Sequence, residues 1–380
     1  MRSKGRTCEV CVMDTSDPDI RFFAEKGCSN CLAMRESMGS DWFNDESGSS
    51  KLERLIAEIK EGGKASEYDS VLGLSGGLDS SYLALKAFDW GLRPLVVHVD
   101  AGWNTELAVR NIQSILDFTG WDFHTVVIDW NEIRDLQLSY LKSGIANQDV
   151  PQDHAFFSSL YKFAAENKIK YILSGGNMAT EGIFPKSWHG PAMDATNLKA
   201  IHKEFGSGKL KKYPTIKFWD LYFVYPFIKK IHQVRPLNFI RYNKIEASYE
   251  LENRIGFKTY ERKHGESVFT RFFQEYYLTS RFGIDKRLAH FSSQIVSGQL
   301  DRNEALKLIE MQMYEANEIL RDIDFLCRKL RITSQEFEIY LTAPRRSYSE
   351  FTNWNRKYRL MKLTQSFIRK IFKIKLAKFS

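Results

Sequence analysis

Between residues 70 and 173, short apolar runs alternate with helical patterns, and this alternation constrains the fold more than any other feature of the sequence. The apolar runs, each typical of a buried strand, lie at residues 70–74, 94–99, 123–129 and 169–173. The helical patterns between them lie at residues 79–90, 106–119 and 153–167. Strands that alternate with helices form βαβ units. The sequence therefore predicts an α/β fold with a doubly wound parallel sheet, covered by helices on both faces.

The segments on either side of this pattern divide the chain into three predicted domains. Residues 1–48 are rich in cysteine and end in a polar stretch, 44–50, that has the composition of a linker. The alternating pattern belongs to residues 49–235. Residues 236–380 have helical patterns throughout, so we predict a helical C-terminal domain there.

Two stretches of the sheet domain depart from the regular alternation. Residues 178–219 are rich in Gly, Pro, Trp and Lys and have weak periodicity, which is typical of a long functional loop. Residues 221–225 form an apolar and aromatic run, which we interpret as the last strand of the sheet.

The first apolar run leads directly into the loop Ser75-Gly76-Gly77-Leu78-Asp79-Ser80. A helix follows, and its first N–H groups lack partners within the helix while its dipole is positive there, so this position favours an anion. Gly76 and Gly77 allow positive φ and a close approach of the backbone to a phosphate. Ser75 and Ser80 offer hydroxyl donors. Because a carboxylate would be repelled by phosphate unless it binds a cation, we assign Asp79 to Mg²⁺.

This loop resembles the PP-loop signature Ser-Gly-Gly-x-Asp-Ser of the ATP pyrophosphatases. It is not a Walker loop, because the Gly-Lys-Ser/Thr ending is absent. The resemblance implies a sheet of PP-loop (adenine nucleotide alpha hydrolase-like) type that binds ATP and splits it between the α- and β-phosphates. Enzymes of this class adenylylate a carbonyl or carboxylate oxygen, and a nucleophile then displaces AMP.

The second predicted strand ends in His98-Val99-Asp100. Ligands of open parallel sheets bind at the carboxyl ends of the strands. In PP-loop enzymes the segment after this strand borders the adenosine, so the resemblance implies that His98, Val99 and Asp100 line the nucleotide site. For Asp100, a turn or helix-capping role is the structural alternative.

The fourth predicted strand is followed by Gly175-Gly176-Asn177 and then by Glu181. This segment resembles the Gly-x-Asn-x-x-Glu region at the same place in NAD synthetase. The resemblance makes Glu181 a second Mg²⁺ ligand and places Gly175, Gly176 and Asn177 beside the nucleotide. The alternative is a glycine-rich loop with solvated polar side chains.

Four of the five cysteines lie near the N-terminus, with the spacing Cys8-x₂-Cys11-x₁₆-Cys28-x₂-Cys31. Two Cys-x-x-Cys turns that aim four sulfurs at one point are typical of a zinc site, and a closed four-thiolate site is structural. In a reducing compartment such clustering favours a metal over disulfides. The fifth cysteine, Cys327, lies in a helical segment and has the character of a small buried apolar residue.

The net charge indicates the kind of partner that the protein binds, and the N-terminal residues indicate its cellular location. The formal net charge of +8 fits anionic partners such as nucleotides, nucleotide-sugars, RNA or anionic lipid. The first residues lack the pattern of a secretory signal, and no run is long and apolar enough to span a bilayer. We therefore expect a cytoplasmic protein.

Longer segments of the chain resemble one enzyme family, and they lie at residues 151–157, 169–177, 262–273 and 282–293. Together with the loop and the cysteine spacing, over most of residues 8–310, they resemble the N-acetyl sugar amidotransferases of bacterial surface-polysaccharide synthesis, the WbpG/PseA type. The resemblance implies an enzyme that converts an acetamido group of a nucleotide-activated sugar to an acetamidino group through an O-adenylyl imidate. The product would serve the synthesis of a lipopolysaccharide O-antigen or a flagellin glycan.

No motif for glutamine hydrolysis is visible in the sequence. The resemblance therefore implies that ammonia comes from a separate glutaminase, with a cyclase-like channel protein, and we expect neither DNA nor RNA as a partner. The alternative hypothesis is a PP-loop tRNA-modifying enzyme of the thiolation type, which also has a zinc head. Such enzymes need further cysteines near the nucleotide, and none occurs between Cys31 and Cys327.

Four cations of the helical domain complete the predicted site: Lys263, Arg271, Lys286 and Arg287. With Asp79 they are our candidate catalytic residues, because cations here could clamp the triphosphate or the sugar diphosphate. The alternative is a solvated or salt-bridged helix face.

The end of the chain is strongly basic. Residues 356–380 contain nine Lys or Arg and no acid, and apolar residues share a helical stripe. Such a tail is typical either of peripheral contact with an anionic membrane surface or of a helix packed on its own domain.

Overall fold

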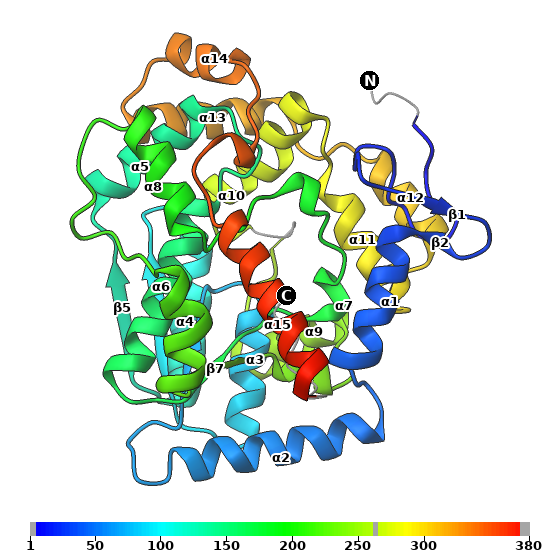
Figure 1. The fold of residues 1–380 in the computed structure, drawn as a ribbon, viewed down its shortest axis with the longest axis vertical. Coiled ribbons are helices and arrows are strands. Elements are labelled where there is room, and N and C mark those ends of the chain that lie inside the picture. The colour runs from blue at the N-terminus through cyan, green and yellow to red at the C-terminus, as the bar shows by residue number, and fades with distance from the viewer. Residues whose placement is uncertain (1–4, 261–264, 373–380) are drawn as a thin grey trace.

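The computed structural model describes residues 5–260 and 265–372 of the chain. Five strands form a parallel sheet in the order β5-β4-β3-β6-β7. Its two edge strands, β5 and β7, are labelled in Figure 1. The strands are β3 (Ser70–Gly73), β4 (Pro94–Asp100), β5 (Phe123–Val127), β6 (Tyr171–Leu173) and β7 (His232–Val234). The strand that leads into the predicted phosphate loop, β3, therefore lies in the middle, between β4 and β6.

Helices cover both faces of this sheet, and they are α2 (Glu46–Gly62), α3 (Leu78–Asp89), α4 (Glu106–Thr119), α6 (Val150–Glu166) and α9 (Lys244–Ile255). Successive side chains of a strand point to opposite faces. Val71 accordingly belongs to a core formed with α6, whereas Leu72 belongs to a core formed with α2, α3, α4 and α9. The predicted doubly wound α/β fold class is confirmed.

The cysteine-rich residues form a small hairpin and a helix: β1 (Phe22–Phe23), β2 (Gly27–Cys28) and α1 (Ser29–Asp41). This module packs against the helical C-terminal region. The N–H of Val12 donates to Ser292 Oγ at 3.1 Å. The Arg302 guanidinium donates to the carbonyls of Cys8 and Cys11 at 2.8 and 3.0 Å. Segments from the two ends of the sequence thus share one apolar core, and the predicted domain boundaries remain predictions.

The C-terminal region is helical, as predicted, and contains α10 (Val268–Phe272), η4 (Phe273–Phe282), α11 (Lys286–Val296), α12 (Arg302–Glu310), α13 (Ala316–Leu330), α14 (Ser334–Thr342), η5 (Tyr348–Glu350) and α15 (Asn355–Phe372). A short segment, η3 (Pro236–Phe239), connects it to the sheet. No helix within the described parts of the chain has the length and apolar character needed to cross a membrane.

Several elements between the strands were not predicted: α5 (Trp130–Ser143), α7 (Met178–Glu181), η1 (Lys186–Trp188) and α8 (Ala195–Phe205). The prediction of an irregular stretch is wrong for α8, because Asp194 caps that helix by accepting the N–H groups of Thr196 and Asn197 at 2.9 and 3.0 Å. The predicted linker is likewise wrong from Glu46 onward. There, Asp45 accepts the Gly48 N–H at 3.2 Å and starts α2.

The apolar run at residues 221–225 is not a strand, so this prediction is wrong. It lies in a π-helical segment, η2 (Asp220–Ile228), and β7 is the last strand. An apolar aromatic run suits a buried helix as well as a strand, and tertiary contacts decide between them. Here the Tyr222 ring lies 5.6 Å from Tyr358 of α15, and their hydroxyls are 3.0 Å apart. The first turns of α15 thus pack on η2, and contact of the basic tail with a membrane stays a prediction.

Candidate functional site

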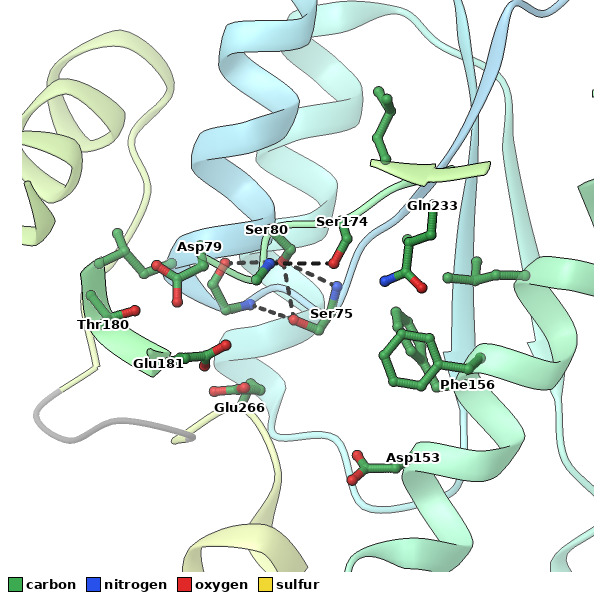
Figure 2. A pocket seen from close by; sticks show the side chains of 18 of the residues that line it. Ser75, Asp79, Ser80, Asp153, Phe156, Ser174, Thr180, Glu181, Gln233 and Glu266 are labelled. Carbon is green, nitrogen blue, oxygen red and sulfur yellow. Dashed lines mark hydrogen bonds between the residues drawn. The ribbon is translucent and has the colours of Figure 1, made fainter. Parts of the chain in front are cut away.

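The predicted phosphate loop joins the carboxyl end of β3 to the first turn of α3 (Figure 2). Ser75 Oγ accepts the Gly77 N–H at 3.2 Å and lies 3.0 Å from Ser80 Oγ. Gly77 is the N-cap residue of α3 and provides no side-chain cap. The loop is therefore held by its own serines, while the N-terminus of the helix keeps the capacity to bind an anion.

Two glycines allow the backbone segments around this loop to approach closely. Gly76 has φ +78°, and a Cβ atom there would lie 2.5 Å from the Ala108 carbonyl oxygen. The Tyr260 hydroxyl donates to the Gly76 carbonyl at 2.9 Å. A Cβ atom on Gly175 would lie 2.9 Å from the backbone of Asp79. A side chain at either glycine would displace the loop or the first turn of α3.

A cavity of about 360 Å³ opens beside the loop, and we call it the loop cavity. Most of the residues predicted to bind the nucleotide line it: Ser75, Gly77, Leu78, Asp79, Ser80, Gly175 and Gly176. Phe156, Phe157 and Leu160 of α6 supply an apolar wall. The loop cavity thus combines an anion-binding helix N-terminus with an apolar surface, as a nucleotide site requires.

Carboxylates gather at one end of the loop cavity. Asp79 and Glu181, the two predicted Mg²⁺ ligands, both line it, together with Glu266 (Figure 2). The Tyr242 hydroxyl donates a hydrogen bond to the Asp79 carboxylate. Burial raises the pKa of Tyr242, which keeps it a neutral donor. Oxygen ligands of this kind suit Mg²⁺, which binds proteins through one or two carboxylates and leaves positions for phosphate oxygens.

A second and larger cavity, of about 1070 Å³, adjoins the first, and we call it the acceptor cavity. The two cavities share six lining residues: Ser75, Asp153, Phe156, Phe157, Glu181 and Glu266. The volume of the acceptor cavity lies at the upper end of the range for small-molecule sites. A second ligand bound there would contact the same loop as a nucleotide in the loop cavity.

The end of β4 faces the acceptor cavity. His98 and Val99 line it, as does Asn177, and none of the three lines the loop cavity. His98 Nε2 lies 2.9 Å from the Asn104 amide nitrogen. Asp100 lines neither cavity, and its carboxylate accepts the Gly102 N–H at 2.7 Å in a turn. The binding roles predicted for His98, Val99, Asp100 and Asn177 remain predictions. The observed contact of Asp100 is that of a turn residue, which was the structural alternative for it.

Two of the predicted catalytic cations form ion pairs outside both cavities. Arg271 pairs with Asp322 at 2.7 Å and lies 3.8 Å from Glu318. Arg287 pairs with Asp285 at 2.9 Å and donates to backbone carbonyls at the end of α12. Neither arginine lines the loop cavity or the acceptor cavity. The geometry therefore gives both side chains a role in joining helices.

The other two cations differ from this pattern. Lys286 is 7% exposed and lines the acceptor cavity, where its Nζ lies 3.3 Å from His189 Nε2. Lys263 lies outside the described residues. Of the three predicted cations that the structure describes, Lys286 alone lies in the wall of a cavity that adjoins the loop.

Sequence reasoning assigned no role to several residues that line or support these cavities. Glu266 Oε1 would lie 3.1 Å from a Cβ atom on Gly77, so its carboxylate faces the phosphate loop. It lies within a segment that carried the family resemblance, near the predicted cations Lys263 and Arg271. Tyr242 and Tyr260 belong to no motif. Asp149, in the acceptor cavity, precedes the segment that carried the resemblance.

The four N-terminal cysteines form one cluster, and they lie in the core of the N-terminal module. Their sulfur atoms all lie within 4.8 Å of one another, and three pairs are 3.7 to 3.8 Å apart. Hydrogen bonds from Cys11 lower the pKa of Cys8 and Cys31, whereas the hydrogen bond with Cys28 raises the pKa of Cys11. Zinc would bind the cluster in its thiolate form.

This geometry fits zinc. Four sulfurs at the Zn–S distance of about 2.3 Å in a tetrahedron are about 3.8 Å apart, which matches the observed separations. All four cysteines are buried, so no position is left for a substrate. Cys327 is also buried, at 4% exposure, in the helical core, as predicted.

Comparisons with known proteins support the predicted resemblance in the C-terminal part of the chain. Residues 266–365 match the family described as LPS biosynthesis protein WbpG-like, C-terminal domain. No curated protein matches the chain significantly.

Two solved structures show weak likenesses. NMN synthetase from Francisella tularensis has a TM-score of 0.38 and 14% identity, with 76% of this chain and 98% of that chain covered. A predicted subunit of tRNA methyltransferase from Methanocaldococcus jannaschii DSM has a TM-score of 0.27 and 12% identity, with 48% and 75% covered. At these TM-scores neither likeness bears on function.

Proposed function

We propose that this chain, whose residues 266–365 match the WbpG-like C-terminal domain, is an ATP-dependent, AMP-forming amidotransferase. Its substrate would be a nucleotide-activated N-acetyl sugar, and its product the acetamidino sugar of a bacterial surface polysaccharide. One observation carries the proposal: the phosphate loop and the two predicted Mg²⁺ ligands, Asp79 and Glu181, line one cavity, and that cavity shares six lining residues with a second, larger one.

In this proposal the loop cavity binds ATP. The N–H groups at the start of α3 and the hydroxyls of Ser75 and Ser80 would hold the pyrophosphate. Asp79 and Glu181 would hold Mg²⁺, which neutralises phosphate charge when bound. The Tyr242 hydroxyl orients Asp79 for that task.

The sugar would bind in the acceptor cavity, with its acetamido oxygen directed at the α-phosphate. The oxygen attacks phosphorus and pyrophosphate leaves, which gives an O-adenylyl imidate. Ammonia then attacks the imidate carbon and AMP departs, because adenylylation turns a poor leaving group into a good one. Apolar walls such as Phe156 and Phe157 would limit hydrolysis of the imidate.

Ammonia would come from a separate glutaminase through a cyclase-like channel protein, in the cytoplasm. The zinc cluster would serve folding, since it is closed and buried.

The competing hypothesis, a tRNA-thiolating PP-loop enzyme, requires a reactive thiol near the nucleotide. Neither cavity has a cysteine among its lining residues in the described parts of the chain. Burial raises the pKa of Cys327, which makes its thiol a poor nucleophile. The geometry therefore favours the amidotransferase.

The experiment is to incubate the protein with ATP, Mg²⁺ and ¹⁵N-ammonium and with a panel of UDP- and CMP-linked N-acetyl sugars. We expect AMP and pyrophosphate, and a sugar whose carbonyl oxygen is replaced by labelled nitrogen. The chain alone should ignore amide-labelled glutamine until a glutaminase is added. ADP as the product, or label in tRNA instead of a sugar, would refute the proposal.

A further inference from the structure

The acceptor cavity contains a buried carboxyl group that the proposed reaction has not yet used. Asp149 is the N-cap residue of α6 and is 7% exposed. Its Oδ1 accepts the Thr270 hydroxyl at 3.1 Å and the Gln152 amide at 3.0 Å. The phenyl rings of Phe156 and Phe273 line the same cavity. Asp149 is thus a buried carboxyl group held by neutral donors.

The surroundings of Asp149 bring the pKa of its carboxyl group close to physiological pH. Burial, and then the charge of Asp153, raise the pKa of Asp149 to about 8, while the hydroxyl of Thr270 and the charge of Lys286 oppose this rise. Other walls of the cavity carry further titratable or charged groups: Asp41, His98, Glu181, Lys186, His189, Arg235, Glu266 and His290. A carboxyl group with this behaviour can exchange a proton at physiological pH.

The first turns of α6 lead from Asp149 to the phosphate loop. Asp153, one turn further along, lines both cavities, and so do Phe156 and Phe157. A small ligand at Asp149 would therefore reach the shared wall of the two cavities along a single helix face. The imidate carbon of the proposed intermediate would lie at that shared wall.

We propose that Asp149 binds ammonium in the acceptor cavity and takes a proton from it, so that neutral ammonia forms beside the activated sugar. This inference rests on the proposed amidotransferase function. A carboxylate and the oxygen atoms of Thr270 and Gln152 are suitable acceptors for the N–H groups of ammonium, and aromatic rings attract a cation. At neutral pH most ammonia is ammonium, which has no lone pair for attack, so a nearby base is required.

The step balances as follows. One proton passes from ammonium to the Asp149 carboxylate, and ammonia remains. Its lone pair forms a bond to the imidate carbon, and the bond from that carbon to the AMP oxygen breaks with both electrons going to AMP. The new nitrogen passes a second proton to the imidate nitrogen and ends as the NH₂ group of an amidinium. No oxidant or reductant takes part.

The first test compares the wild type with Asp149→Asn, which keeps the shape and the Oδ1 acceptor. We expect kcat/KM for ammonium to fall by about 100-fold or more at pH 7, with the deficit shrinking at alkaline pH, where free ammonia predominates. AMP formation with sugar but without ammonium, which reports hydrolysis of the imidate, should fall by a much smaller factor. A wild-type pH profile in Asp149→Asn, or an equal loss of AMP formation without ammonium, would refute the role of Asp149.

Thr270→Val gives a second variant of nearly equal shape. It removes a donor that favours the Asp149 anion, so the acidic limb of the pH profile should move to higher pH. Because an acceptor for ammonium is also lost, KM for ammonium should rise. A residue with only a structural role would lower the rate without moving that limb, and this result would also refute the inference.

A binding measurement separates this inference from the proposed function. Melting temperatures are compared in ammonium chloride and in sodium chloride at equal ionic strength and pH 8, for the wild type and Asp149→Asn. We expect ammonium to stabilise the wild type alone. Equal effects of ammonium on both proteins would refute an ammonium site at Asp149, whether or not any sugar is turned over. If ammonium stabilises only the wild type and no sugar yields AMP, the proposed function fails and the ammonium site stands.

Discussion

The substitution Asp149→Asn should stabilise the folded protein, and increasingly so as the pH rises. The folded-state pKa of Asp149 is raised to about 8, chiefly by burial, whereas an unfolded Asp titrates at about 3.9. Between these two values the unfolded chain loses this proton and the folded chain keeps it. Wild-type stability therefore falls as the pH rises through this window, by about 1.4 kcal/mol per unit.

The full effect approaches about 5 kcal/mol near pH 8, which is large beside a typical unfolding free energy of about 5–15 kcal/mol. Asparagine carries no proton equilibrium, so it escapes this loss. Any change in hydrogen bonding to Thr270 or Gln152 adds a constant that does not depend on pH. The slope of the difference between the two proteins, and not its size at one pH, is thus the signature of the buried carboxyl group.

The assay is urea unfolding of both proteins from pH 5 to pH 9, followed by fluorescence and by circular dichroism. The variant should gain stability over the wild type steadily up to pH 8 and then hold that advantage. Parallel curves across the whole range would show that Asp149 is ionised in the folded protein, and would refute the reasoning. The surface substitution Asp117→Asn, on the exposed side of α4, serves as the control and should show no such slope.

The other predictions concern the loop and the cluster. Asp79→Asn should abolish AMP formation because a proposed Mg²⁺ ligand is lost. The control Asp89→Asn, at the far end of the same helix, should retain AMP formation. Equal activities of the two variants in a coupled pyrophosphate assay would place the metal elsewhere. Gly76→Ala should cost at least about 1–2 kcal/mol in urea unfolding, since φ is +78° and the added Cβ meets a backbone oxygen at 2.5 Å; wild-type stability would contradict the loop geometry. Elemental analysis should find about one zinc per chain. Cys28→Ser should lose both metal and thermal stability, and Cys327→Ser should change neither the zinc content nor AMP formation.

Local features of the fold were predictable because short-range physics determines them. The strand, loop and helix around Ser75 follow from apolar runs, glycines and a helix start that are neighbours in the sequence. The cysteine spacing predicted a cluster because each Cys-x-x-Cys turn already brings two sulfurs together. The helix at Glu106–Thr119 has the predicted bounds, since Thr105 caps its start and Gly120, with φ +65°, ends it.

Features that depend on distant partners were not predictable in the same way. The run at residues 221–225 has the composition of a strand, and its helical form goes with aromatic contacts to α15, more than 130 positions later. In the sequence, Arg271 and Arg287 were candidates for the cations of the site on the same grounds as Lys286. Their carboxylate partners take the two arginines out of the cavities, while Lys286 lines one.

The sequence by itself determined the parallel sheet, the phosphate loop and the four-cysteine cluster, because each is encoded by residues close together in the chain. Only the tertiary structure decided which carboxylates meet the loop and which carboxyl group is removed from water. Glu266 reaches Gly77 across almost 190 positions, and Asp149 contacts residues of α10 and η4 that lie more than 100 positions later. Burial and charge act through space, so the ionisation of a side chain is a property of the folded molecule.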